Sequence, residues 1–348
     1  MAHNNKSRKL APESDDFDIS DLPSDIREHI LSFMSSREAV RTSVLSKPWR
    51  HLWKCVPVVR INETVEECNT FLGTFLLGRN HTPINVCDIE LTDIETTEMH
   101  DVVDKWIFHV VTQCHVRELR VIIRLQGDFL WLKNQALVSK HLKRLEIDKV
   151  HLDAKTVDFS SCPSLEELDL MYCTIKAEYI ISKSLKRLIA EECEFSGADT
   201  RAHIIFPSLV FLKLNGICSC IPLLEGMPLL QVAYVRLGES CLDLCQYNKT
   251  WGCHVDCNFP CTPIDDDKEG SILLEGLSNS TQLELLNEPV MVCLHFPSIP
   301  FPTLFIFSCS LLNILCVPMF PQNKLTKKYF ILTLTLEEIG DHYTNMFQ

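Results

Sequence analysis

The stretch that decides the fold runs from Asp21 to Pro57 and reads DLPSDIREHILSFMSSREAVRTSVLSKPWRHLWKCVP. Its apolar residues recur at helical spacing in three short segments. A helical unit of fewer than about 40 residues rarely buries a sufficient core by itself. The stretch therefore predicts three short helices that bury part of their apolar surface against the rest of the chain or against another protein.

The first predicted helix begins near Pro23, whose fixed φ suits a helix start. Its apolar residues lie at positions i, i+4, i+7 and i+8, which places them on one face. These residues are Ile26, Ile30, Phe33 and Met34.

A second and a third helix are expected to follow the first. Ser35-Ser36 offers a stop and then an N-cap for the second helix, and Ser46 offers an N-cap for the third. The second helix carries Ala39, Val40 and Val44. In the third, two indoles share a face because Trp49, Leu52 and Trp53 lie at i, i+3 and i+4, and Pro57 ends the helix.

In residue order and type, this stretch resembles the F-box. The matching segments are Leu22-Pro23, Ile30-Leu31-Ser32-Phe33, Ala39-Val40-Arg41, Val44-Leu45-Ser46 and Trp49-Arg50-His51-Leu52-Trp53. Two positions depart from the pattern: Met34 stands where leucine is common, and Lys47-Pro48 stands where two basic residues are usual. The resemblance implies that the module binds a Skp-type adaptor and, through it, a cullin–RING ubiquitin ligase.

Two interpretations of the helical module stay open at this point. It is either a small bundle that only docks on the rest of the chain, or a docking module whose apolar helix face lies in a groove of a partner. The resemblance favours the docking module. The adaptor interface and its supporting core are then expected to comprise Leu22, Pro23, Ile26, Ile30, Val44, Leu45, Trp49 and Trp53.

After this module, the sequence becomes repetitive with the template LxxLxL. Seven rows fit it, and they begin at Val86, Val116, Leu142, Leu165, Leu185, Leu209 and Leu230. Successive rows start 30, 26, 23, 20, 24 and 21 residues apart, close to the roughly 20–29 residues of leucine-rich repeats. Each row predicts one short parallel strand, and stacked rows predict a solenoid with its strands on the concave face. The fold class is thus α/β.

The segments between the rows differ in length. Thr64–Gly78 begins with a capping box of Thr64 and Glu67, and Glu98–Gln113 keeps an apolar stripe on one side, so both predict full helices. The later segments are expected to hold no more than a turn or two of helix on the convex side.

One residue in each row lies between the last two apolar positions and should point to the concave face. This column is Glu90, Arg120, Glu146, Asp169, Ile189, Lys213 and Tyr234. For any single residue an ordinary solvated sheet face is the simpler interpretation; for the whole column, a binding surface is equally well supported. F-box proteins with such repeats generally use them to capture the protein to be ubiquitinated, and Leu273–Leu286 also resembles plant F-box proteins with leucine-rich repeats of the FBD-related group.

Composition and charge limit the function further. The chain has 348 residues, 46% of them hydrophobic, and a net charge of −13, which argues against nucleic acid as a partner because phosphate binding needs a basic face. Its 17 cysteines are scattered and odd in number, and Met1–Leu10 lacks the apolar core of a signal peptide. We therefore expect reduced thiols in a nuclear or cytoplasmic protein.

The expected organisation has six parts. They are a disordered tail over 1–17, the F-box over 18–58, the repeat solenoid over 59–260, an acidic loop over 261–270, further repeats over 271–302 and an atypical tail over 303–348. Six thiol and imidazole side chains crowd together between Cys241 and Cys261, but their spacing lacks paired C-x₂-C, so a thiol-rich loop is favoured over zinc.

The tail after Pro302 is expected to leave the template. Its proline-free apolar run over Thr303–Val317 is 15 residues long, short of the roughly 17–25 residues of a membrane helix. A variant ending of the transcript is the other interpretation, and it would leave the solenoid without its polar cap.

No catalytic or cofactor pattern is present in the sequence. It contains no Gly-x-Gly, no G-x-S-x-G and no H-E-x-x-H. We therefore expect no metal, no cofactor and no catalytic residue, and we interpret the chain as a non-catalytic receptor subunit of an SCF-type ubiquitin ligase. The alternatives are a repeat scaffold that does not deliver its partner for ubiquitination, a truncated or inactive F-box variant, and a form tethered to a membrane.

Overall fold

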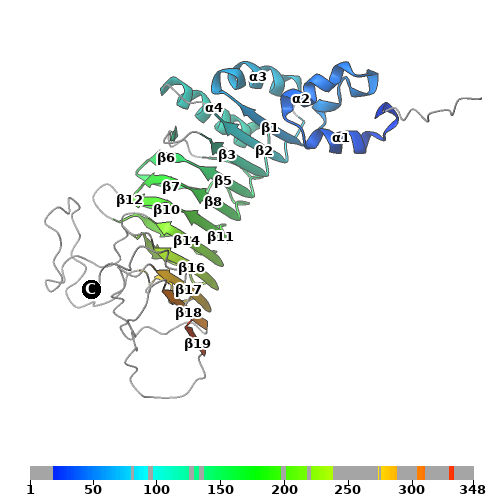
Figure 1. The fold of residues 1–348 in the computed structure, drawn as a ribbon. Helices are drawn as coiled ribbons and strands as arrows, with labels where there is room; N and C mark the ends of the chain where they lie inside the picture. The colour runs from blue at the N-terminus through cyan, green and yellow to red at the C-terminus, as the bar shows by residue number, and fades with distance from the viewer. Residues whose placement is uncertain are drawn as a thin grey trace, which may run out of the picture.

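The computed structural model describes a helical module followed by a solenoid of parallel strands (Figure 1). The described residues are 19–79, 82–92, 97–124, 129–132, 137–196, 201–217, 221–237, 273, 276–287, 304–309 and 329–332. The expected tail over 1–17, the cysteine-rich segment and the acidic loop over 261–270 lie outside them.

The helical module begins with a 3-10 turn, η1 (Ile19–Asp21), and two α-helices, α1 (Ser24–Ser32) and α2 (Ser36–Arg41). Ser35 caps α2 by accepting a hydrogen bond from the Glu38 amide, and the Glu38 side chain bonds back to Ser35, so the expected N-cap is confirmed. The third helix is not formed as one piece. Two 3-10 turns replace it, η3 (Lys47–Trp49) and η4 (Leu52–Lys54), because His51 between them leaves the helical region with φ −120° and ψ 2°. The segment predicted for the second helix also ends in a 3-10 turn, η2 (Thr42–Val44).

The solenoid is built on one sheet of eleven strands in the described residues, all paired in parallel. Its order follows the chain from the strand beside the helical module, and Figure 1 shows this row from blue to red. The strands are β1 (Val58–Glu63), β2 (Val86–Leu91), β3 (Glu118–Ile123), β5 (Arg144–Asp148), β8 (Glu167–Met171), β11 (Arg187–Glu191), β14 (Phe211–Ile217), β16 (Val232–Leu237), β17 (Gln282–Asn287), β18 (Leu304–Cys309) and β19 (Tyr329–Leu332).

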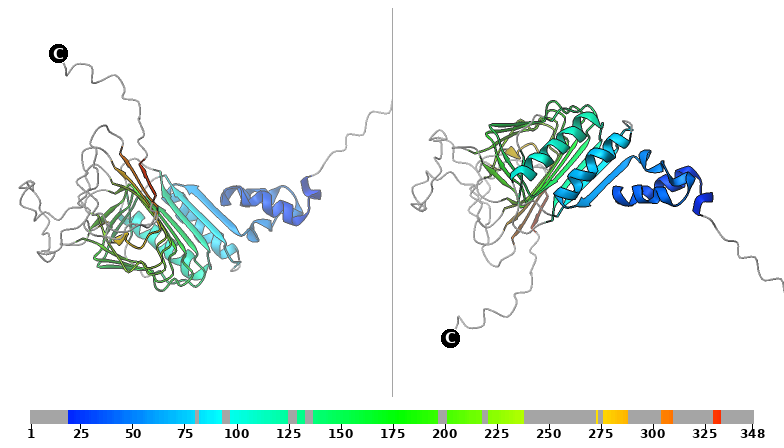
Figure 2. Two further views of the ribbon diagram at one scale, coloured as in Figure 1. Left: turned by 90° about the horizontal axis from the view of Figure 1, so that it is seen from below. Right: turned by 90° about the horizontal axis from the view of Figure 1, so that it is seen from above.

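The first two crossovers hold the expected helices, α3 (Val65–Gly78) and α4 (Thr97–Gln113). Both cover the same side of the first strands, as the right-hand view of Figure 2 shows. The side chain of Thr64 accepts a hydrogen bond from the Glu67 amide, which supplies one half of the predicted capping box.

The later crossovers hold short strands where turns of helix were expected. They form two sheets of four strands each in the described residues. One sheet comprises β7 (Thr156–Asp158), β10 (Tyr179–Ile181), β13 (His203–Ile205) and β15 (Leu223–Glu225); the other comprises β4 (Leu130–Leu132), β6 (Val150–Asp153), β9 (Thr174–Lys176) and β12 (Glu194–Ser196). In six of these strands the central residue is buried and is β-branched, aromatic or leucine, and β-branched and aromatic residues favour strands over helix. These residues are Val157, Ile175, Ile180, Phe195, Ile204 and Leu224.

The core is a stack of apolar rows, one from each repeat. The three template residues of a row are buried, as in Leu165, Leu168 and Leu170 of the repeat that contains β8. A further buried residue three positions on is Cys173 in this repeat and Cys193 in the next, which completes the leucine-rich-repeat pattern LxxLxLxxC. The predicted α/β solenoid is therefore confirmed.

The structure corrects the first row and adds one before it. Asp88 of β2, and not Glu90, pairs in register with Arg120 of β3, so the row begins at Ile84 rather than at Val86. The added row is Val56, Val59 and Ile61, all buried, and its strand β1 pairs with β2. The repeat stack thus starts within the polypeptide assigned to the helical module.

Two more strands continue the sheet at the other end. The expected return of the solenoid at Leu273–Leu286 is confirmed, because β17 pairs in parallel with β16. The tail was expected to break the template, yet β18 pairs with β17 and β19 pairs with β18, so the backbone of Leu304–Cys309 and of Tyr329–Leu332 extends the same sheet.

Candidate protein-interaction surfaces

The helical module has a small core of its own. Its centre is the indole of Trp49, which is 1% exposed, and the guanidinium of Arg27 lies 6.0 Å from the centroid of that ring. The buried apolar residues of this core are Leu31, Ala39, Trp49, Leu52 and Val56. Helix α1 therefore contributes Leu31 to the core, and not the face of Ile26 and Phe33 that the spacing suggested.

That other face of α1 is an apolar surface open to solvent. Ile26 and Phe33, seven residues apart and hence on one side of the helix, are both exposed, Phe33 to 69%. Val44 at the end of η2 is 85% exposed and Leu45 is 60% exposed. Ile19 is exposed as well, and we refer to the five exposed apolar residues of this module as the N-terminal apolar patch: Ile19, Ile26, Phe33, Val44 and Leu45.

The two ends of this patch are tied together in the fold. The hydroxyls of Ser20 and Ser46 lie 2.9 Å apart and are hydrogen-bonded, which brings the segment that contains Ile19 next to the segment that contains Val44 and Leu45. Exposed apolar groups that gather on a small, well-packed module are typical of a protein–protein contact.

The eight residues expected to form the adaptor interface and its supporting core fall into three groups. Four are exposed, three are half-buried and one is buried. The exposed residues are Pro23, Ile26, Val44 and Leu45; Leu22, Ile30 and Trp53 are half-buried; and Trp49 is buried. Sequence analysis placed Phe33 on the apolar face of the helix but left it out of the interface, although it is among the most exposed apolar residues of the module.

The helical module is joined to the first repeat by polar contacts. The guanidinium of Arg37 on α2 forms a bidentate ion pair with Glu63 at the end of β1. The hydroxyl of Ser36 accepts a hydrogen bond of 3.1 Å from the Arg60 amide of β1. Helix α2 is thus attached to the edge strand of the sheet.

A buried arginine strengthens the same junction. Arg79, which follows α3, is 2% exposed and donates hydrogen bonds to the carbonyls of Trp53 at 3.1 Å and Val56 at 2.7 Å. Burial lowers the pKa of this guanidinium. The ring of Trp53 stacks on Phe75 of α3 with centroids 5.4 Å apart, so the end of the helical module and the start of the solenoid share one packed unit.

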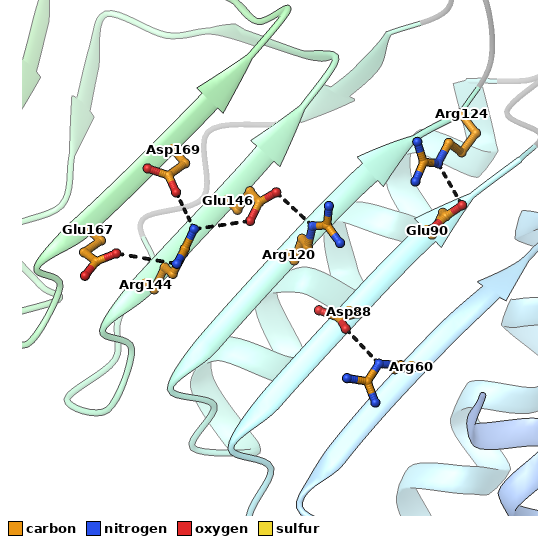
Figure 3. A network of polar contacts seen from close by, with 9 residues as sticks. All are labelled: Arg60, Asp88, Glu90, Arg120, Arg124, Arg144, Glu146, Glu167 and Asp169. Carbon is orange, nitrogen blue, oxygen red and sulfur yellow. Dashed lines mark hydrogen bonds and ion pairs between the residues drawn. The ribbon is translucent and has the colours of Figure 1, made fainter. Parts of the chain in front are cut away.

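The open face of the large sheet, the side opposite α3 and α4, carries the column of residues expected to contact a target. In its first half, ion pairs join side chains of neighbouring strands (Figure 3). Arg60 pairs with Asp88 at 3.2 Å, and Arg120 pairs with Glu146 at 2.8 Å. Glu90 does not lie level with Arg120 and pairs with Arg124 at 2.8 Å.

Asp169 is the most buried acidic residue among these cross-strand ion pairs. It accepts hydrogen bonds from Arg144 at 2.6 Å and from Arg187 at 3.1 Å, on the strands to either side. Burial raises the pKa of its carboxyl group, and the two guanidiniums act in the opposite direction. From the sequence, these charged side chains were expected to be available to a ligand. In the structure, most of them form ion pairs with charged side chains of neighbouring strands.

The second half of the column is different. Ile189, Lys213 and Tyr234 lie level on β11, β14 and β16. Lys213 pairs with Glu191, and the hydroxyl of Tyr234 accepts a hydrogen bond of 3.3 Å from Gln282. This half of the open face therefore combines apolar and aromatic groups with cations.

Most free thiols of the described residues are buried, and Cys55 is exposed. Burial raises the pKa of Cys68 to about 12 and also raises the pKa of Cys87 and Cys162. Among the described residues, no three His, Cys, Asp or Glu side chains are grouped as metal ligands. No helix within this part of the chain is long and apolar enough to cross a bilayer.

Comparisons with known proteins identify a family domain and several relatives of this chain. The family model of the F-box domain matches residues 19–60. An F-box/LRR-repeat protein of Arabidopsis thaliana is 30% identical over 234 residues, covering 57% of this chain and 74% of the relative. An FBD-associated F-box protein of the same plant is 28% identical over 249 residues, covering 64% of this chain and 57% of the relative. No solved structure matches the chain.

A further F-box/LRR-repeat protein of Arabidopsis thaliana is 31% identical over 209 residues, covering 49% of this chain and 47% of the relative. The chain spans about half the length of several of the curated relatives it matches.

A helical F-box module joined to a repeat solenoid with its own open face defines the class of F-box proteins with repeats. Within that class, the chain belongs to the F-box/LRR-repeat family of plant proteins. Members of this family are generally non-catalytic substrate adaptors of SCF ligases.

Proposed function

We propose that this protein is the substrate-receptor subunit of an SCF-type ubiquitin ligase. The F-box binds a Skp-type adaptor and through it a cullin–RING ligase, and the solenoid binds a target protein. The chain itself is not an enzyme in this proposal. It raises the effective concentration of activated ubiquitin near lysines of the target by holding both partners at once.

The observation that carries the proposal is the N-terminal apolar patch on an F-box. Val44 and Leu45 expose large aliphatic side chains although buried Trp49 and Leu52 already supply the module with a core. Because exposure of such groups is unfavourable, their removal from water by an adaptor would contribute about 1.5–3 kcal/mol for each side chain that is fully buried.

The test is co-precipitation of the full chain with a purified Skp-type adaptor. A variant with Val44→Ser and Leu45→Ser should lose adaptor binding by at least about tenfold while keeping its circular dichroism spectrum, since both side chains are exposed. Leu77→Ser is the matched control, because Leu77 is 81% exposed on α3, away from the F-box core, and should leave adaptor binding unchanged.

Two outcomes would contradict the proposal. If the wild-type chain does not retain the adaptor, the protein is a repeat scaffold or an inactive F-box variant rather than a ligase subunit. If the Val44 and Leu45 variant binds as well as wild type, the patch is not the adaptor surface. The proposal also places the protein in the nucleus or the cytoplasm, which imaging of a fluorescent fusion would test.

A further inference from the structure

The open face of the large sheet is divided into two parts of opposite charge. On β1, β2, β3, β5 and β8 the outward-facing residues include the anions Asp88, Glu90, Glu118, Glu146, Asp148, Glu167 and Asp169 and the cations Arg60, Arg120 and Arg144, and a further cation, Arg124, follows β3. The anions still outnumber the cations. On β11, β14 and β16 the outward-facing residues include the cations Arg187, Lys213 and Arg236 and the anion Glu191, and the next strand, β17, places a second anion, Glu284, level with Tyr234. The cations remain in excess. The chain as a whole carries −13, so the basic part is a local exception.

The basic part is also the apolar part of this face. Ile189, Phe211, Val232 and Tyr234 are all half-buried and lie on three adjacent strands. Phe211 pairs in register with Val232, and its ring centroid lies 5.7 Å from that of Tyr234. At the equivalent positions of β5 and β8 the side chains are Arg144, Glu146, Glu167 and Asp169.

Contacts within this group hold it in place. The guanidinium of Arg187 lies 5.2 Å above the Phe211 ring while one of its nitrogens donates to Asp169. An aromatic ring held beneath an arginine, within a half-buried apolar surface, has the composition of an interface hot spot.

We propose that the strands β11, β14 and β16 hold the target-recognition site, and that it binds an acidic segment of a target protein through a large apolar or aromatic side chain. We call this surface the basic aromatic patch, and define it by Arg187, Ile189, Phe211, Lys213, Val232, Tyr234 and Arg236. The apolar side chain of the target packs against Phe211 and Tyr234. Acidic residues on either side of it in the target form ion pairs with the three cations. If the target segment were shifted along the sheet, its acidic residues would lie over the acidic part of the open face and be repelled.

This inference rests on the proposed function, since it assigns the target-binding step to one part of the solenoid. The sequence predicted a target-binding column of seven residues spread along the whole sheet, whereas the proposed site is confined to three adjacent strands. The first half of the column, from Asp88 to Asp169, then repels wrong registers rather than contacting the target directly.

The test uses the full chain co-purified with its adaptor and three fluorescein-labelled peptide pools, followed by fluorescence anisotropy. One pool fixes a phenylalanine between aspartate and glutamate positions, the second fixes it between lysine and arginine positions, and the third has alanine between acidic positions. The first pool should bind at least about tenfold more tightly than either of the others, and added salt should weaken it.

Variants connect the binding to the patch. Phe211→Ser and Arg187→Ser should each weaken binding of the first pool by about tenfold. Val86→Ser is the matched control, because Val86 is a half-buried apolar residue in the same lateral column of the open face but on β2, in the acidic part. Binding that is unchanged in Phe211→Ser and Arg187→Ser overturns the proposal.

Two other occupants of the patch are distinguished by the same assay. The acidic stretch Asp265-Asp266-Asp267 of this chain could compete for it, so the triple serine variant of these residues is measured in parallel. Failure of the acidic pool to bind both wild type and that variant overturns the proposal, as does a dimer in gel filtration that Phe211→Ser dissociates. If adaptor binding persists while the acidic pool fails, this inference alone is wrong and the proposed function stands.

Discussion

Asp148, at the end of β5, is a carboxylate held in an unfavourable environment. It is 8% exposed, and its Oδ1 has no hydrogen-bond partner among the described residues. Burial raises the pKa of this carboxyl above its ordinary value of 3.8, more than the nearby Lys149 and Arg124 lower it. The ionised side chain therefore costs stability, in contrast to Asp169, which has two arginine partners.

The consequence is a pH-dependent effect of Asp148→Asn. An acid whose pKa is raised by folding stabilises the folded state while protonated, and this contribution is lost as the pH rises from 3.8 through the raised pKa. At pH 7 the variant should thus be more stable than wild type by about 1 kcal/mol, and the difference should vanish below pH 3.8. Urea unfolding at several pH values measures it.

The control for this prediction is Asp88→Asn, which removes an acid that is partly exposed and paired with Arg60. A pair of this kind contributes about 0–1 kcal/mol, so this variant should be neutral or slightly less stable at pH 7. An Asp148→Asn protein that is less stable than wild type at pH 7 would contradict the prediction, because it would show that the ionised carboxylate of Asp148 has favourable interactions in solution.

The elements of the solenoid could largely be predicted from the sequence, because each row repeats the same apolar spacing. The register of the first row could not be predicted from the sequence. Ile84-x-x-Cys87-x-Ile89 and Val86-x-x-Ile89-x-Leu91 both fit the template, and a slip of two residues keeps every side chain on its own face. Only pairing with β3 shows that Asp88 stands where Glu90 was expected.

In the F-box, too, local elements could be predicted from the sequence while the packing between them could not. Its segments and its Ser35 cap were predictable, because each depends on neighbouring residues. The division of its apolar residues into core and surface was not, since it depends on how the turns around Trp49 pack on α1. The predicted set therefore joined interface and supporting core without separating them; Trp49 lies in the core, and the exposed Phe33 was not in the set.

The turns that end four successive strands of the large sheet share one backbone conformation. Lys149, Tyr172, Glu192 and Gly216 follow or end β5, β8, β11 and β14 with φ between 50° and 66°. This left-handed conformation costs a residue with a side chain roughly 1–2 kcal/mol. The repeat geometry imposes it on three such residues, and only Gly216 adopts it without that cost.

Two glycine substitutions should therefore have opposite effects. Gly216→Ala should destabilise the chain by about 1–2 kcal/mol, because its φ is +66° and the carboxylate of Glu192 must move away from the new methyl group. Gly73→Ala in α3 should stabilise the chain by about 0.5–1 kcal/mol, because alanine is favoured over glycine within a helix and the added methyl group would have no neighbouring atom within 4 Å. Urea denaturation of both variants against wild type measures this, and equal effects would contradict it.

At the scale of the whole molecule, the F-box and the solenoid meet in one packed junction. Trp53 contacts the buried clusters of both, and Arg79 bonds to carbonyls of the F-box end from its position after α3. The N-terminal apolar patch and the basic aromatic patch therefore lie on one continuous scaffold, with the F-box at one end of the strand row in Figure 1. A fixed spacing of this kind suits a protein that must present a target at a set place.

The junction predicts how the two parts should open in solution. Trp53→Ala removes an indole that stacks on Phe75 and should destabilise the chain by about 3–5 kcal/mol. Because the side chain belongs to both clusters, amide hydrogen exchange should accelerate both in α1 and α2 and in α3. Trp131→Ala is the matched control, since this indole is 54% exposed on β4 and should leave exchange in those helices unchanged. Faster exchange in the F-box helices alone would show that the two parts open independently, and the spacing between the adaptor and the target would then not be fixed by this junction.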